Sequence, residues 1–482
     1  MKIQLPAHKT KVICTIGPAS QSEVVLSDMM RRGMTIARIN LSHGTQEEHR
    51  QTIASIRRVA KRLGRRCPIL ADLPGAKMRI GRLETEPLSL TKGAEVTLTT
   101  EDVLGTPTLI PVTYRRLPES VLPGSVIYLN DGFIALDVVT VRRHEVRCIV
   151  ATGGQLLSGK GLNLPGAKTF MSAITDEDLE LMDFALGEGV DTFGISFVET
   201  PADIMKARTV ARERGKDIHV VAKIERAPAV ENIDGILEVA DAIMIARGDL
   251  GVEIPIEEVP IVQKKLIRKA NLACRPVITA TQMLESMIDN TRPTRAEVTD
   301  VANAILDGTD AVMMSEETAI GSYPVEAVEV MVRIGRAMEQ QRHTIRSSTF
   351  LQQQLKEELS TRQITVPDAV SLNVSEAVRA LGSPFVLTAT SGGMTARRVS
   401  RFKPEGWIIA CNNDQRICDF LRFSYGVFPM VMDTGTGEWH RQLINLLKDS
   451  GLVRGGDRVI RTEGTFSGTT GGTDSLGIIT IS

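Results

Sequence analysis

The 482-residue chain has no cysteine cluster, almost no net charge and no long apolar run. Its six cysteines lie far apart and none forms a CxxC pair, which argues against a zinc cluster or a disulfide framework and fits a reducing compartment. The net charge of −1 gives no global attraction to nucleic acid or to an anionic membrane. No run reaches membrane-spanning length, and residues 1–6 carry no apolar signal core. We therefore expect a cytoplasmic protein with neither nucleic acid nor a membrane as partner.

Short apolar runs alternate with helical patterns, which is typical of parallel βα units. The runs predicted as strands are 11–17, 35–41, 68–72, 191–198, 218–225, 242–247, 276–281 and 310–315. Helices are predicted at 45–63, 256–273, 294–307 and 324–341, with further helix starts signalled by a capping box at Thr175 and by Pro201. Eight βα units favour a closed barrel of roughly 250 residues, and residues 1–79 and 168–345 supply that length.

Two further domains are predicted outside the barrel. Residues 80–167 contain short strand patterns and turn signals such as Asn130-Asp131-Gly132, so we interpret them as an all-β domain inserted into a barrel loop, where it acts as a lid. Residues 346–482 begin with a polar stretch at 352–361, expected on the surface, and continue as an α/β domain. The predicted fold class is therefore α/β: an eight-stranded parallel β/α barrel with an inserted all-β lid domain and a C-terminal α/β domain.

Two charged residues interrupt the apolar run 218–225. Lys223 and Glu225 are two residues apart, so alternation places them on the same face of a strand. Asp249 follows the next predicted strand. A buried charge is costly without a partner or a ligand. One interpretation is a buried Lys–Glu ion pair of purely structural value. The other is a divalent metal held by the carboxylates beside an anionic substrate.

Polar residues also follow the other predicted strands, at the end of a barrel where active sites are built. They include Arg38, Asn40, Ser42 and His43 at the end of 35–41; Asp72, Lys77 and Arg79 at or beyond the end of 68–72; Thr279, Thr281 and Gln282 at the end of 276–281; and Ser315, Glu316 and Glu317 at the end of 310–315. A single such residue, for example His43 or Thr279, is usually a cap or a loop hydrogen bond. Convergence of many is harder to explain structurally, since each desolvated group needs a partner. Cations, carboxylates and hydroxyls together suit magnesium-assisted phosphoryl transfer.

Six motifs follow one another along the chain. They are Ile39-Asn40-Leu41-Ser42-His43-Gly44, Gly159-Lys160-Gly161-Leu162-Asn163-Leu164-Pro165-Gly166, Lys223-Ile224-Glu225, Ala246-Arg247-Gly248-Asp249-Leu250-Gly251-Val252-Glu253, Thr281-Gln282-Met283-Leu284-Glu285-Ser286-Met287 and Met314-Ser315-Glu316-Glu317-Thr318-Ala319. In this order they resemble the pyruvate kinase family over essentially the whole chain. The resemblance implies transfer of the phosphoryl group of phosphoenolpyruvate to ADP, which gives pyruvate and ATP in the last step of glycolysis.

The resemblance also implies roles for individual residues. Glu225 and Asp249 would hold Mg²⁺, for which Mn²⁺ can substitute. Lys223 and Arg38 would face the phosphoryl group, and the amides around Gly248 and Asp249, with Thr281, would hold the substrate carboxylate. The nucleotide-binding residues would be Asn40, His43, Arg79 and Lys160, with Lys160 at the lid hinge. Thr281 and Ser315 are candidates for the proton path to the enolate, through water, because a free hydroxyl is too weak an acid to act alone.

One departure from the family pattern concerns potassium. The family's monovalent-cation pocket resembles Asn40, Ser42, Asp72 and the carbonyl of Leu73. Relatives with Glu at the position of Lys77 need K⁺, whereas relatives with Lys there resemble a potassium-independent class, bacterial in type. A tethered ammonium can supply the charge of a bound monovalent ion, so we expect that K⁺ is not required. The alternative is a solvated lysine beside a turn.

A second departure lies in the C-terminal domain. Thr390, Ser391, Gly392, Gly393 and Thr395 correspond to the family loop that holds a phosphate of an allosteric effector, but the loop has an extra residue and no lysine. A glycine turn that opens a helix presents amides to an anion, and Thr465–Thr473 would close over the ligand. We expect activation by a sugar phosphate or a nucleotide monophosphate; the alternative is an ordinary strand–helix turn.

Two other functions compete with an active kinase of this family. A metabolite sensor could keep the pocket and lose turnover, although Lys223, Glu225, Asp249 and Thr281 are all present. Another magnesium-dependent barrel enzyme, such as a lyase acting on a pyruvate-like acid, would not account for Lys160 in the lid or for the C-terminal domain. The resemblance further implies a homotetramer.

Overall fold

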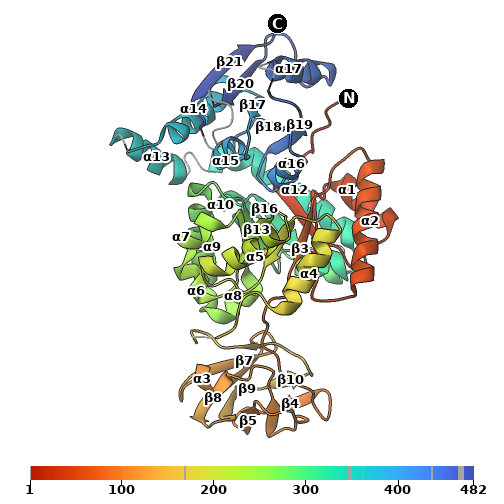
Figure 1. Cartoon of the computed structure of the whole chain (residues 1–482), viewed down its shortest axis with the longest axis vertical. Coiled ribbons are helices and arrows are strands. Elements are labelled where there is room, and N and C mark those ends of the chain that lie inside the picture. Colours follow the sequence, from red (N-terminus) through yellow and green to blue (C-terminus); the bar gives the residue numbers. More distant parts are fainter. Residues whose placement is uncertain (1, 168–169, 346–349, 362, 436–437, 465–471) are drawn as a thin grey trace.

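The computed structural model describes residues 2–167, 170–345, 350–361, 363–435, 438–464 and 472–482. Three bodies follow one another along its longest axis: the lid domain at one end, the barrel in the middle and the C-terminal domain at the other end (Figure 1). Among the described residues, no helix has the length and apolar character needed to cross a membrane.

Eight parallel strands close the barrel in the order β1-β16-β15-β14-β13-β12-β3-β2. They are β1 (Lys11–Thr15), β2 (Ile36–Asn40), β3 (Ile69–Asp72), β12 (Thr192–Ile195), β13 (His219–Ile224), β14 (Ala242–Ala246), β15 (Val277–Ala280) and β16 (Ala311–Met314). Each lies within one of the predicted runs, so the prediction of an eight-stranded parallel barrel is confirmed. Their residues are nearly all buried, because helices cover the outer face and side chains fill the interior.

Helices alternate with these strands around the barrel. They are α1 (Glu23–Arg32), α2 (Gln46–Arg62), α4 (Asp176–Gly187), α5 (Pro201–Glu213), α6 (Ala227–Glu231), α7 (Ile233–Val239), α8 (Arg247–Glu253), α9 (Val259–Leu272), α10 (Arg295–Asp307), α11 (Glu316–Ala319) and α12 (Pro324–Ile345). Capping boxes at Thr45, Thr175 and Thr294 start three of them. The Thr175 box has a further use, because the second carboxylate oxygen of its partner Asp178 accepts the Gly75 amide at 2.9 Å and fixes the turn after β3.

The lid domain is inserted between β3 and α4. Its strands are β4 (Leu88–Leu90), β5 (Glu95–Thr99), β6 (Leu109–Pro111), β7 (Val126–Leu129), β8 (Ile134–Val141), β9 (Glu145–Thr152), β10 (Gly154–Leu156) and β11 (Leu162–Asn163), with one short helix, α3 (Leu117–Ser120). Six of them form a sheet in the order β11-β7-β8-β9-β5-β6 around an apolar core of its own. Asn130, Asp131 and Gly132 have positive φ and form the predicted β7–β8 turn.

The C-terminal domain is built on a five-stranded sheet in the order β19-β18-β17-β20-β21, in which only the β20–β21 pair is antiparallel. Its strands are β17 (Phe385–Ala389), β18 (Trp407–Asn412), β19 (Val427–Val431), β20 (Arg458–Glu463) and β21 (Ser475–Thr480). Its helices are α13 (Phe350–Ser360), α14 (Val366–Leu381), α15 (Met394–Ser400), α16 (Gln415–Leu421) and α17 (Trp439–Asp449).

The stretch 352–361, expected at the surface, is exposed or half-buried at its described residues except Leu355. It lies almost entirely in α13, and Leu351 and Leu355 are buried in a small apolar cluster with Leu372 and Phe402. The spacing of four residues puts both leucines on one helix face. Two leucines among glutamines and charged residues are too few to give a recognisable amphipathic pattern in the sequence.

The C-terminal domain and the lid occupy opposite ends of the barrel. At the amino ends of the strands, Lys11 Nζ donates to Val427 O at 2.8 Å, and Lys403 forms a 2.6 Å ion pair with Asp310, just before β16. At the carboxyl ends, the lid turn approaches α8, since a Cβ on Gly132 would lie 3.4 Å from Val252. The lid domain in Figure 1 therefore faces the carboxyl ends of the strands, where barrels of this kind carry their active sites.

Candidate active site

Lys223 lies at the centre of a buried network at the carboxyl end of β13. Its Nζ is 2.9 Å from Glu225 Oε1 and 3.3 Å from Asp72 Oδ1. It also donates a 2.7 Å hydrogen bond to Ser196 Oγ, whose own hydroxyl donates to the Leu73 carbonyl at 2.7 Å. Groups from the ends of β3, β12 and β13 therefore hold one ammonium in a fixed position.

Arg38 completes this network from β2. Its Nε and a terminal nitrogen both contact Asp72 Oδ2, at 2.7 and 2.6 Å, and Nη1 donates to Thr15 Oγ1 at 2.9 Å. The Asp72 side chain is only 1% exposed, and those of Arg38 and Lys223 are 11% and 12% exposed. Arg38 and Lys223 thus flank the Asp72 carboxylate. Each keeps a small part of its side chain exposed at the barrel mouth, which suits the binding of an anion.

The charges set the protonation states. Burial lowers the pKa of Lys223, but Asp72 and Glu225 outweigh it and raise that pKa above its ordinary value. Burial raises the pKa of Asp72, but Lys223 and Arg38 hold it below its usual range. The pKa of Glu225 is raised, by burial first and also by the nearby Asp249 carboxylate, against the effect of Lys223. Glu225 and Asp249 are therefore close enough for their charges to repel each other, and a cation shared between them would relieve that repulsion.

Asp249 lies in the first turn of α8 and forms an ion pair with Lys77. Lys77 Nζ is 3.5 Å from Asp249 Oδ1 and 3.9 Å from Asp131 Oδ1 of the lid turn. Lys77 follows β3 after a turn in which Gly75 has a φ of +65°; a Cβ there would lie 2.9 Å from Ser196 Cβ. The ammonium of Lys77 thus joins the barrel mouth to the lid instead of extending into solvent.

Glu225 and Asp249 are hard oxygen donors of the kind that Mg²⁺ prefers. Among the described residues, no cluster of three or more His, Cys, Asp or Glu side chains forms a metal site. Two carboxylates fit a magnesium ion that also takes oxygens from substrate and water, which is how protein-bound Mg²⁺ is usually coordinated.

Thr281 connects β15 to α8. Its hydroxyl accepts the Gly248 amide at 2.8 Å and donates to the Ala280 carbonyl at 2.6 Å. Thr281 and Gln282 have φ values of +65° and +53°, so two successive non-glycine residues occupy the left-handed region. Such strain is concentrated at functional sites and persists only where the surroundings hold it.

The predicted nucleotide residues form a separate group. Arg79 Nη1 donates to Gly159 O, and the Ile80 amide donates to Lys160 O, both at 2.9 Å, so Arg79 and Lys160 lie on the two neighbouring segments that join lid and barrel. Asn40 Oδ1 accepts the Ser42 amide at 3.2 Å, and His43 is exposed beside it. Within the described part of the chain, the contacts of Lys223 include none of these four residues.

Ser315 and the Leu73 carbonyl also lie at strand ends. The Ser315 amide donates to Glu317 Oε2 at 2.7 Å, which makes the buried Glu317 a support for the loop after β16. The Leu73 carbonyl, assigned by resemblance to the monovalent-cation pocket, accepts the Ser196 hydroxyl.

Sequence reasoning missed Ser196 and Glu253. Ser196 follows β12 directly, so the same strand-end rule could have found it. Glu253, at the end of α8, lies 4.0 Å from Arg226 and hydrogen bonds the side chain of Asn163 in the lid. Its burial raises its pKa to about 7. Glu253 ends the motif that begins at Ala246, but its contacts could not be predicted because its partners are distant in the sequence.

The predicted effector loop runs between β17 and α15. Gly393 has a φ of +78°, and the Ser391 carbonyl accepts Asn412 Nδ2 at 2.9 Å. Thr395 Oγ1 shares a 2.7 Å hydrogen bond with Thr473 Oγ1. Most of the closing segment 465–473 lies outside the described residues; its last residues approach the loop through this bond.

Comparison with known proteins identifies the family. A model described as "Pyruvate kinase, barrel domain" matches residues 7–328, and one described as "Pyruvate kinase, alpha/beta domain" matches residues 368–479. The pyruvate kinase of Thermococcus litoralis is 50% identical over 479 residues, covering 99% of this chain and 100% of the relative. The pyruvate kinase of Geobacillus stearothermophilus is 43% identical over 98% of this chain and 81% of the relative. A crystal structure of a pyruvate kinase from Cryptosporidium parvum has a TM-score of 0.89 and 35% identity over 98% of this chain and 96% of that one. The chain therefore belongs to the pyruvate kinase family and is a phosphotransferase.

Proposed function

We propose that this phosphotransferase moves the phosphoryl group of phosphoenolpyruvate to ADP by the residue roles set out below. The phosphorus–oxygen bond to the enol breaks, a bond to a terminal oxygen of ADP forms, and the enolate takes a proton at carbon to give pyruvate. The observation that carries the proposal is the buried network in which Lys223, Arg38 and Asp72 meet Glu225 at the barrel mouth.

Glu225 and Asp249 would hold Mg²⁺, or Mn²⁺ in its place. When bound, the ion would neutralise charge on the substrate oxygens, beside the positive charges of Lys223 and Arg38. Burial raises the pKa of Glu225 and the Asp249 carboxylate raises it further, so the two carboxylates lie near each other at the barrel mouth. Two neighbouring carboxylates are the oxygen donors that Mg²⁺ usually takes from a protein, which supports a metal between them.

Lys223 and Arg38 are proposed to face the migrating phosphoryl group. Asp72 fixes Arg38 through two contacts and Lys223 through one, so both cations are preorganised and need little rearrangement during the reaction. The raised pKa of Lys223 keeps it charged near neutral pH. A fixed positive charge beside equatorial phosphoryl oxygens stabilises the transition state.

Thr281, Gly248 and Asp249 are proposed to hold the substrate carboxylate through hydroxyl and amide donors. In the absence of substrate the Gly248 amide is directed at Thr281 Oγ1, so the two groups are already side by side. Thr281 also donates to Ala280 O, which engages its proton. Thr281 and Ser315, through water, are both proposed for the proton path to the enolate, because a free hydroxyl is too weak an acid to act alone.

The nucleotide is proposed to bind at the lid hinge, where Arg79 and Lys160 lie on adjacent segments, with Asn40 and His43 on the barrel side. Lid closure would then bring Lys160 to the phosphates and exclude water.

Lys77 is proposed to replace K⁺, in a potassium-independent and bacterial-type subclass. Its ammonium lies 3.5 Å from Asp249, inside the charged cluster, which favours this role over that of a solvated lysine. The monovalent-cation pocket assigned by resemblance to Asn40, Ser42, Asp72 and Leu73 would then not need to bind K⁺.

The remaining proposals concern regulation and assembly. A sugar phosphate or nucleotide monophosphate would bind at Thr390, Ser391, Gly392, Gly393 and Thr395 and activate. We propose domains at 1–79 with 168–345, 80–167 and 346–482, a homotetramer and a cytoplasmic location. Calorimetric titration with a panel of phosphorylated metabolites tests the effector site, and a panel that is silent throughout contradicts it.

A coupled assay for pyruvate tests the central proposal. Phosphoenolpyruvate and ADP with Mg²⁺ should give pyruvate and ATP in equal amounts, and omission of ADP should abolish the reaction. Binding of phosphoenolpyruvate without turnover would favour the metabolite sensor instead.

A further inference from the structure

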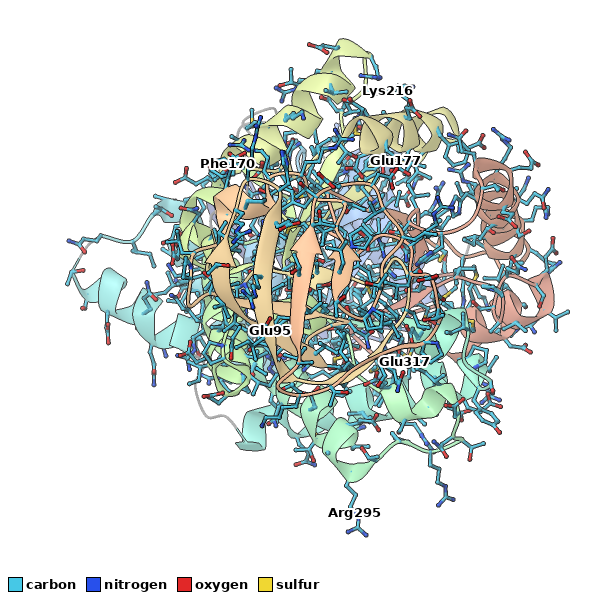
Figure 2. The ribbon with its side chains drawn as sticks, turned by 90° about the horizontal axis from the view of Figure 1, so that it is seen from below. Glu95, Phe170, Glu177, Lys216, Arg295 and Glu317 are labelled. Atoms are coloured by element: carbon cyan, nitrogen blue, oxygen red, sulfur yellow. The ribbon has the colours of Figure 1, made fainter. Side chains whose placement is uncertain are left out.

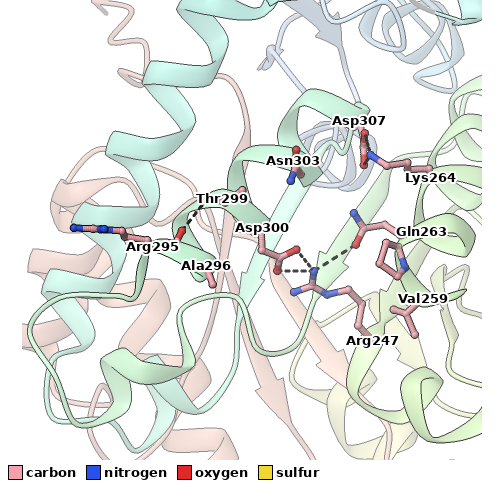
Figure 3. A pocket seen from close by; sticks show the side chains of 11 residues that line it. Arg247, Val259, Gln263, Lys264, Arg295, Ala296, Thr299, Asp300, Asn303 and Asp307 are labelled. Carbon is pink, nitrogen blue, oxygen red and sulfur yellow. Dashed lines mark hydrogen bonds and ion pairs between the residues drawn. The ribbon is translucent and has the colours of Figure 1, made fainter. Parts of the chain in front are cut away.

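Arg247, which begins α8, connects three elements behind the proposed carboxylate site. Its Nη2 donates to the Thr281 carbonyl at 2.8 Å, and its Nε donates to the Ala280 carbonyl at 3.2 Å. Its Nη1 lies 2.6 Å from Asp300 Oδ2 and 2.7 Å from Oδ1. One guanidinium thus holds the carbonyls of Ala280 and Thr281 and is itself held by one carboxylate of α10. Figure 3 shows the contact of Arg247 with Asp300.

The backbone that Arg247 holds is strained. Thr281 and Gln282 both have positive φ, and their conformation sets where the Thr281 hydroxyl and the adjacent Gly248 amide point. A conformation of this kind needs surrounding bonds to persist. Arg247 donates its hydrogen bond to the carbonyl of the strained residue Thr281 itself. If the Arg247 side chain lost its orientation, the Thr281–Gln282 backbone would therefore be free to relax.

Asp300 of α10 orients Arg247 from the side opposite the Ala280 and Thr281 carbonyls. It lines a cavity of about 480 Å³ between α9 and α10, and its side chain is 37% exposed, whereas that of Arg247 is 12% exposed. Gln263 also contacts Arg247, but at 3.4 Å and without charge. The shorter, charged contact of Nη1 with both Asp300 oxygens is the stronger restraint. Arg295, on the same helix, projects outward from the barrel rim (Figure 2), so it does not take part.

We infer that Asp300 is a positioning residue for substrate binding: through Arg247 it fixes the strained Thr281 loop, although it touches no substrate. The inference rests on the role proposed for Thr281 in holding the phosphoenolpyruvate carboxylate. It assigns a substrate-affinity function to a residue outside the catalytic cluster.

The test compares Asp300→Asn with Asp307→Asn. Asp307 is two helical turns further along α10, lines the same cavity and pairs with Lys264 at 2.6 Å, not with Arg247. Both variants remove one negative charge from the cavity. Asp300→Asn should raise the KM for phosphoenolpyruvate about tenfold, in line with loss of one charge-assisted hydrogen bond, with the KM for ADP within about twofold of the parent. Asp307→Asn should leave both constants unchanged.

Calorimetric titration of phosphoenolpyruvate with Mg²⁺, without ADP, provides a readout independent of turnover. The Kd should rise with the KM in Asp300→Asn, and Asp300→Glu, which restores the charge, should recover part of the affinity. Equal effects of Asp300→Asn and Asp307→Asn, or equal rises in both KM values, would overturn the inference. If Asp300→Asn does not fold, Arg247→Lys is measured instead, because lysine cannot hold both carbonyls and the carboxylate.

Thr281→Val separates this inference from the function on which it rests. If Thr281→Val binds phosphoenolpyruvate normally, the proposed carboxylate site is wrong. If Thr281→Val loses affinity and Asp300→Asn does not, only the positioning role of Asp300 is wrong.

Discussion

Lys223 and Glu225 lie two residues apart at the end of β13, and their charged atoms are 2.9 Å apart. The pair is not isolated, because Lys223 also contacts Asp72, and Asp249 acts on Glu225. A simple buried ion pair would be satisfied by its two members. Here Lys223 and Glu225 belong to a larger charged cluster in which a second carboxylate, Asp249, lies near Glu225, which supports a metal-binding interpretation of the pair.

Replacement of Asp72 should destabilise the fold. Asp72→Ala leaves Arg38 and Lys223 nearly buried without their common partner, which costs about 3–5 kcal/mol. Because the pKa of Asp72 is lowered by Lys223 and Arg38 against burial, this stabilisation is present above its ordinary pKa and is lost as pH falls through the lower folded value.

Thermal unfolding at neutral pH measures this effect. The control is Asp183→Ala, which removes a surface carboxylate paired with Arg214 and should cost less than about 1 kcal/mol. A similar melting temperature for the two variants would show that Asp72 is not a structural centre of the site.

Lys77→Glu should create a requirement for potassium. The substitution removes the ammonium beside Asp249 and adds a negative charge, so the barrel mouth would need an external monovalent cation. Steady-state rates in potassium- and sodium-free buffer should fall at least tenfold relative to the parent and recover when KCl is added. The parent should change by less than about twofold on the same addition. A large activation of the parent by KCl argues against the assignment.

Glu253 should give the protein a pH-dependent stability. Burial raises its folded pKa from 4.5 to about 7. The folded state therefore binds more protons than the unfolded state between these values, and stability from this group falls as pH rises from 4.5 to 7. Full ionisation above pH 7 costs about 3 kcal/mol.

Glu253→Gln removes this cost, so the variant should gain stability relative to the parent at pH 8 and much less at pH 5. Melting temperatures at the two pH values measure the difference. Glu257→Gln, an exposed glutamate beside α9, serves as the control. A gain that is the same at both pH values would mean that Glu253 is ionised throughout.

The barrel and much of its site were predictable from local sequence. Strand alternation placed Lys223 beside Glu225, and the rule that parallel strands end at one edge gathered Arg38, Asp72 and Asp249. Both rules depend only on backbone geometry and on short apolar runs. They carry no information about which strand-end groups touch one another.

Contacts between distant segments were not predictable in this way. Arg247 and Asp300 are 53 residues apart and lie on different helices, so no period in the sequence links them. The Lys77–Asp249 pair depends on a turn whose direction is set by Gly75 and Asp178. In α13, two buried leucines among polar residues gave too weak a pattern to reveal an amphipathic helix.

The most direct measurement is turnover and substrate binding in Lys223→Met, with Lys11→Met as control. Lys11 is also a buried barrel-strand lysine, but it lies at the amino end, where it donates to Val427. Lys223→Met should lose turnover by about 10³-fold or more while calorimetry still detects phosphoenolpyruvate binding with Mg²⁺, and Lys11→Met should keep near-normal turnover. Near-normal turnover in Lys223→Met would contradict the account.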